Sequence, residues 1–108
     1  MSGTVTVYAT FPSKEEALRI ARILVEERQA ACANILGPCH SIYHWQGAIE
    51  EAAEFAALFK TRADLAASLI DRLTALHPYE LPAAVVWPIA NPLGPYSEWI
   101  HSETVKVV

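Results

Sequence analysis

The chain has 108 residues and a mass of 11.9 kDa, and at about 100–200 residues per domain it is predicted to form one domain, residues 1–108. Its net charge is −4 with no basic cluster, which argues against nucleic acid as a partner. Charged residues make up only 19%, against about 25% in a typical domain, while 53% are hydrophobic. We therefore expect part of the apolar surface to be covered by another copy of the chain.

Other function classes are excluded by missing patterns. No apolar run approaches the roughly 18 residues of a membrane span, and the first residues do not resemble a signal peptide. Two cysteines, Cys32 and Cys39, are too few for the disulfide framework of a small secreted protein. The chain also lacks a glycine-rich phosphate loop, a G-x-S-x-G elbow and a C-x-x-C pair. These absences predict a cytoplasmic, non-enzymatic protein.

The first predicted strand, residues 4–10, is rich in β-branched and aromatic residues. Ser13 and Glu16 have the spacing of a capping box, which predicts a helix from there to about Gln29. Its apolar residues recur at helical spacing and form one stripe: Ala17, Ile20, Ala21, Leu24 and Val25.

A long hairpin is predicted next. Its first arm is a strand over 31–35 that bends at Gly37-Pro38 and resumes over 39–45. Gln46-Gly47 form the turn, and the second arm covers 49–61. Near the centre of that arm both faces are apolar, although a sheet with helices on one side should alternate apolar with polar residues. We therefore expect another surface to cover the second face, and the hairpin to protrude.

A second helix is predicted between a cap at 61–64 and Pro78, followed by a strand over 83–89 and a short closing helix around Trp99. The order of elements is β-α-β-β-α-β. It predicts an α+β, ferredoxin-like sandwich with both helices on one face of a four-stranded antiparallel sheet, a long central hairpin and a short C-terminal helix.

Several segments resemble the CutA family, which is named for divalent-cation tolerance. They are Glu26-Glu27-Arg28 leading into 30–35 (AACANI), then 41–47 (SIYHWQG), 59–61 (FKT), 76–82 (LHPYELP), Pro88-Ile89 and Tyr96-x-x-Trp99. The resemblance implies a homotrimer similar in architecture to PII signalling proteins. It also implies a role in tolerance of copper and other divalent cations, without an assigned catalytic activity.

The resemblance also implies a metal site. Copper binding has been proposed for the family through a cysteine in the first strand and histidines before the His-Pro-Tyr proline. Here Ala9 stands at the cysteine position and Leu76 precedes His77, so only His77 is carried over as a metal ligand. Since imidazole suits copper and zinc, His77 is the candidate. The alternative is a structural histidine whose positive form interacts with the C-terminal end of the helix dipole.

His40, His44 and Cys39 are not predicted to hold one metal ion together. His40 and His44 lie in a strand, where four residues span about 13 Å, too far for one ion. Cys39 adjoins His40 but points to the opposite face. Cys32 is predicted to be a packed core thiol. Glu50, Glu51 and Glu54 form an acidic patch that is predicted to be solvated or to join an inter-subunit salt bridge.

Tyr43 and Trp45 share a face near the hairpin turn, and aromatic residues there are predicted either to pack between subunits or to line an inter-subunit pocket. Lys60 is predicted to contribute a cation to that pocket, or to form a surface ion pair with Glu54 or another carboxylate. Tyr79 is predicted to lie beside the pocket.

Three functions follow as hypotheses. The first is a metal-tolerance homotrimer. The second is a PII-like sensor that binds a small anionic metabolite in the clefts between subunits. The third is a scaffold that presents its surface to another protein.

Overall fold

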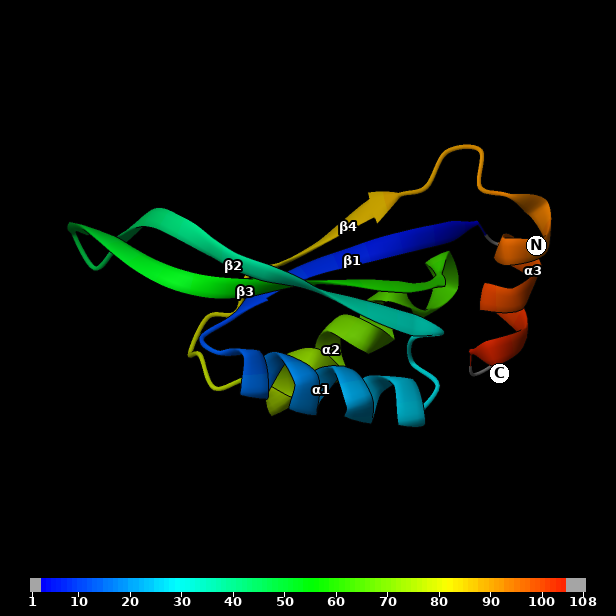
Figure 1. The fold of residues 1–108 in the computed structure, drawn as a ribbon, viewed down its shortest axis with the longest axis horizontal. Coiled ribbons are helices and arrows are strands. Elements are labelled where there is room, and N and C mark those ends of the chain that lie inside the picture. The colour runs from blue at the N-terminus through cyan, green and yellow to red at the C-terminus, as the bar shows by residue number, and fades with distance from the viewer. Residues whose placement is uncertain (1–2, 105–108) are drawn as a thin grey trace.

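The computed structural model describes residues 3–104. In chain order the elements are β1 (Thr4–Phe11), α1 (Lys14–Glu26), β2 (Cys32–Trp45), β3 (Ala48–Arg62), the 3-10 turn η1 (Ala63–Leu65), α2 (Ala66–Leu76), β4 (Ala84–Pro88) and α3 (Gly94–Glu103). Within these residues the strands form one antiparallel sheet in the order β2-β3-β1-β4. Helices α1 and α2 lie on the same face of the sheet, and α3 lies beyond its end (Figure 1). The predicted ferredoxin-like α+β fold is confirmed.

The core fills the layer between the sheet and the helices α1 and α2. Its buried apolar side chains are Val7, Ala9, Phe11, Ala17, Ile20, Ala21, Leu24, Ala30, Ala57, Phe59, Leu69 and Leu73. Phe11 and Phe59 meet edge to face, with ring centroids 6.4 Å apart, which is a favoured aromatic geometry. The predicted stripe of the first helix is confirmed for four of its five residues, whereas Val25 is exposed.

Helix α1 begins as predicted but ends earlier. The Ser13 hydroxyl accepts a hydrogen bond from the Glu16 N–H at 3.2 Å, while the Glu16 carboxylate bonds Arg19 at 2.6 Å and leaves the capping box half formed. The helix stops at Glu26 because Arg28 adopts a left-handed conformation, with φ of 60°. The guanidinium of Arg28 donates to the Glu103 carbonyl at 3.2 Å, which ties this turn to α3.

The predicted cap of the second helix is wrong. The 3-10 turn η1 precedes α2, and no side chain caps the N-terminus of either. The Asp64 carboxylate bonds the Arg62 guanidinium at 2.9 and 2.7 Å, a bidentate pair. The helix ends as predicted, because His77 is extended and Pro78 follows it.

Strands β2 and β3 form the protruding hairpin that was predicted. Strand β1 pairs with β3 only as far as the Phe11–Phe55 contact, so residues 48–54 of β3 pair with β2 alone. This two-stranded ribbon extends away from the helices in Figure 1. The turn at Gln46-Gly47 has both residues at positive φ, as hairpin turns of this length require. The register shift between Ile35 and Pro38 confirms the predicted bend.

The face of the sheet away from the helices, here called the helix-free face, carries aromatic and aliphatic side chains. Alternation along the strands places Tyr8, Leu58 and Trp87 there. Tyr8 and Trp87 stack with ring centroids 4.9 Å apart, and Trp87 is 48% exposed. Val85, also on this face, is 47% exposed. The described chain therefore leaves part of an apolar face open to solvent, as the composition of the third strand predicts.

Candidate functional site

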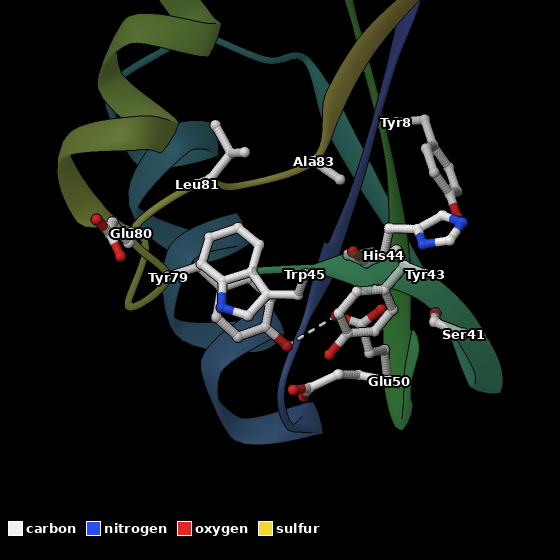
Figure 2. Close-up of a pocket in the computed structure, with 12 residues that line it drawn as sticks. Tyr8, Ser41, Tyr43, His44, Trp45, Glu50, Tyr79, Glu80, Leu81 and Ala83 are labelled. Atoms are coloured by element: carbon white, nitrogen blue, oxygen red, sulfur yellow. Dashed lines mark hydrogen bonds between the residues drawn. The ribbon is translucent and has the colours of Figure 1, made fainter. Parts of the chain in front are cut away.

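The hairpin and the segment after α2 enclose a pocket of about 560 Å³ (Figure 2). Residues from three parts of the chain line it: Tyr8 and Thr10 from β1; Ser41, Tyr43, His44, Trp45, Glu50 and Glu54 from the hairpin; and Tyr79, Glu80, Leu81 and Ala83 from the connection to β4. The structure thus brings together four of the five residues predicted for a pocket or interface: Tyr43, Trp45, Glu54 and Tyr79.

A hydrogen bond between Tyr79 and Glu54 joins the two walls of the pocket (Figure 2). The Tyr79 hydroxyl donates to Glu54 Oε2 at 2.7 Å, and the whole Glu54 residue is only 7% exposed. Burial, followed by the bond to Glu54, raises the pKa of Tyr79 well above its ordinary value. The phenol therefore keeps its proton at physiological pH and serves as a hydrogen-bond donor to the carboxylate.

Tyr8 also lines the pocket, although it was not among the predicted site residues. Burial, then the nearby Cys39 and Glu54, raises the pKa of its phenol. Side chains alternate between the two faces of a strand, so Tyr8 and Thr10 share the face opposite the core residues Val7 and Ala9. This alternation in the first strand is the sequence signal that indicates Tyr8.

Lys60, the fifth predicted pocket residue, does not line this pocket. Its ammonium group donates to Asn34 Oδ1 at 2.6 Å instead. The alternative, an ion pair with Glu54, is not formed, because six residues along a strand span about 20 Å. Glu54 has Tyr79 as its hydrogen-bond partner.

His77 does not line the pocket but hydrogen-bonds the backbone of two residues that do, Thr10 and Tyr79. Its ring is buried, Nε2 lies 2.8 Å from the Thr10 carbonyl, and Nδ1 accepts from the Tyr79 N–H at 3.1 Å. Because the carbonyl only accepts and the amide only donates, this pattern assigns the neutral tautomer with the proton on Nε2. The ring also stacks on Phe11, with centroids 4.9 Å apart. His77 thereby fixes the backbone of Tyr79.

A metal ion at His77 would have to displace one of these two hydrogen bonds, so the metal role stays a prediction. Among residues 3–104 no group of three or more His, Cys, Asp or Glu side chains is arranged to hold an ion. His40 Nε2 instead lies 2.6 Å from Glu51 Oε1 on the exposed hairpin, and His44 lines the pocket.

Cys32 is not the core thiol that was predicted. It pairs with Lys60 in the sheet, on the face away from the helices, and is half-buried. Its sulfur lies 3.5 Å from the Tyr96 hydroxyl. The ring of Tyr96 stacks with that of Trp99, with ring centroids 5.8 Å apart. The hydrogen bond with Cys32, then burial, raises the pKa of Tyr96 to about 12.

Replacing Tyr96 with phenylalanine is expected to flatten the alkaline loss of stability. The folded-state pKa lies above the ordinary value of 10, so the unfolded chain loses this proton first. The stabilising contribution is complete below pH 10 and disappears as the pH rises to about 12. Urea-unfolding midpoints measured across this range should fall less steeply for Tyr96→Phe than for the wild type. Equal slopes would contradict the assignment.

Comparison with known proteins decides the family. A family profile described as "CutA1 divalent ion tolerance protein" matches residues 5–103. The chain belongs to the CutA1 family. The "Divalent-cation tolerance protein CutA" of Thermus thermophilus is 45% identical over 98 residues, which cover 91% of this chain and 95% of that protein. "Protein CutA" of Mus musculus is 37% identical over 100 residues, 93% of this chain. The chain spans 56% of the length of the mouse protein.

Solved CutA1 structures share the fold. The Thermus thermophilus protein has a TM-score of 0.91 at 43% identity and covers 94% of this chain and 99% of its own. The Archaeoglobus fulgidus protein, described as periplasmic, has a TM-score of 0.89 at 41% identity and covers 93% and 97%. A relative from Arabidopsis thaliana is described as chloroplastic. Within residues 3–104 the helices are too short or too polar to cross a membrane.

Proposed function

We propose that this CutA1 chain is a non-enzymatic homotrimer that acts in divalent-cation tolerance in the cytoplasm, with copper or another divalent cation as its metal. The observation that carries the assembly is the uncovered helix-free face together with the hairpin ribbon. A two-stranded ribbon is marginally stable alone in water, and its Ile42 and Ile49 side chains are 67% and 69% exposed. Packing three helix-free faces together, with each hairpin against a neighbour, covers both.

Sedimentation velocity at micromolar concentration tests the assembly. We expect a single species of three times 11.9 kDa, because the apolar area covered in the trimer stays wet in a lone chain. A stable species of 11.9 kDa would contradict the proposal.

Copper titration tests the metal proposal. The wild type is expected to bind copper, and His77→Ala to weaken that binding by at least about tenfold, the lower limit seen when even a supporting residue of a metal site is lost. His77→Gln is a second variant, since its amide nitrogen can still donate to the Thr10 carbonyl and keep the loop in place.

His40→Ala serves as the control, because His40 is exposed on the hairpin and bonds Glu51. The proposal that His77 is a copper ligand would be contradicted if the wild type bound no copper. It would also be contradicted if the wild type and both His77 variants bound copper equally well.

The PII-like alternative, a sensor of small anions, receives no support from the pocket. Its lining contains the carboxyl side chains Glu50, Glu54 and Glu80 and no lysine or arginine. An anion placed there would meet like charges without a compensating cation from this chain.

A further inference from the structure

The hairpin ribbon, defined here as residues 39–54, has few backbone links to the sheet at its base. Strand β1 pairs with β3 as far as Phe55, and beyond that residue only β2 and β3 are paired. At the same level β2 has its register shift between Ile35 and Pro38, and an extra residue of this kind bends a strand. Backbone pairing alone therefore fixes the angle between the ribbon and the sheet only loosely.

One side-chain hydrogen bond spans this base. Glu54 is the first ribbon residue beyond the last pair with β1, and its Oε2 accepts from the Tyr79 hydroxyl at 2.7 Å (Figure 2). Among residues 3–104, no other side-chain hydrogen bond joins residues 39–54 to the rest of the chain, because the bond between His40 and Glu51 lies within the ribbon. Glu54 is nearly buried, so water competes little for its bond to Tyr79.

Tyr79 is itself fixed to the core. Its N–H donates to His77 Nδ1 at 3.1 Å, and Nε2 of the same ring lies 2.8 Å from the Thr10 carbonyl on β1. The His77 ring lies between two other rings, with centroids 4.9 Å from Phe11 and 4.7 Å from Tyr79. Phe11 belongs to the buried core. A phenol held in this way has little freedom of its own, so its bond to Glu54 sets the ribbon relative to the core.

The ribbon offers apolar side chains to a neighbouring subunit on both of its faces. Alternation along its strands places Tyr43 and Trp45 on the helix-free side, and Ile42 and Ile49 on the other side. A ribbon that swings must be brought to one angle before it can pack, and this loss of freedom weakens association. A ribbon that is already held at that angle avoids the loss.

We propose that the bond between Tyr79 and Glu54 is a brace that fixes the angle of the ribbon and so prepares it to pack against a second copy of this chain. The consequence for assembly rests on the proposed homotrimer, whereas the brace itself lies within one chain. Tyr79 and Glu54 are therefore positioning residues of the assembly, and the apolar side chains of the ribbon make the contact.

Hydrogen exchange measured by mass spectrometry tests the brace in Tyr79→Phe, which loses the hydroxyl and keeps the ring. We expect the amides of residues 39–54 to exchange at least about tenfold faster than in the wild type, the lower end for losing a hydrogen bond to a charged group, and those of α1 to be unchanged. Glu54→Gln keeps an oxygen that can accept from Tyr79, so its effect should be smaller. In the double variant Glu54→Gln should add little, because the bond is already lost.

Subunit exchange tests the consequence for assembly. Unlabelled protein is mixed with protein carrying a heavy isotope, and native mass spectrometry follows the appearance of mixed trimers. Tyr79→Phe is expected to form them at least about tenfold faster than the wild type, because each of its ribbons is held less firmly against the neighbouring subunit.

Tyr96→Phe is the matched control. It also removes a hydrogen-bonded tyrosine hydroxyl, but that hydroxyl belongs to α3, so the amides of residues 39–54 should exchange as in the wild type. The inference is overturned if Tyr79→Phe speeds ribbon exchange no more than Tyr96→Phe does, or if it loosens the ribbon without speeding the mixing of subunits. A monomeric wild type would overturn the homotrimer and the consequence for assembly, whereas the exchange of residues 39–54 would still decide whether the brace exists.

Discussion

Replacing Leu58 with lysine is expected to turn the trimer into monomers. Leu58 lies on β3, the strand between β2 and β1, and its side chain points to the helix-free face. In the proposed trimer the substitution places one ammonium group per subunit in the packed interface. Removing such a charge from water costs several kcal/mol per ion, and three like charges also repel one another. Sedimentation velocity should show the mass fall from three times 11.9 kDa to 11.9 kDa.

Leu18→Lys is the matched control for that experiment. Leu18 is 45% exposed on α1, on the other side of the sheet, and lysine suits a helix as well as leucine does. We expect this variant to remain trimeric and to unfold at the wild-type temperature. A trimeric Leu58→Lys protein would mean that the helix-free face is not the surface that joins the subunits.

The elements themselves were predictable because local chemistry decides them. Gln46-Gly47 supplies two residues that tolerate positive φ between alternating strands, so both the turn and the register of the hairpin follow from the sequence. Gly37-Pro38 disturbs pairing wherever it occurs in a strand, and the register shift lies there. Ser13 caps α1 through its own hydroxyl, which needs no distant partner.

The C-terminal end of α1 was less predictable than its start. Glu26-Glu27-Arg28 favours a helix, and a left-handed residue after a helix is usually glycine. Here Arg28 takes that conformation, at a cost of about 1–2 kcal/mol, and its guanidinium reaches the carbonyl of Glu103, 75 residues later. No local pattern in the sequence contains that contact.

The pocket was predictable in part for the same reason. Tyr43 and Trp45 share a face by simple alternation along the strand. The bond between Tyr79 and Glu54 depends on how the connection after α2 folds back against the hairpin, which spacing does not reveal. Lys60 does not line this pocket, because six strand residues separate it from Glu54, and its place in an inter-subunit pocket stays a prediction.

Changing Leu24 to alanine is expected to reduce the free energy of unfolding by about 2–5 kcal/mol. Leu24 is fully buried in the cluster between α1 and the sheet, together with Phe59 and Leu69. Alanine removes the apolar contacts and leaves a cavity that the rigid sheet cannot close. Urea unfolding at a fixed protein concentration measures the change, and the fixed concentration matters because assembly adds to apparent stability.

Leu18→Ala on the same helix separates burial from helix propensity. Both variants make the same chemical change in α1, but Leu18 is 45% exposed and Leu24 is fully buried. Because alanine is the best helix former and little surface is uncovered, Leu18→Ala should stay within about 0.5 kcal/mol of the wild type. If the two variants lowered the free energy of unfolding equally, burial between α1 and the sheet would not be what stabilises this fold.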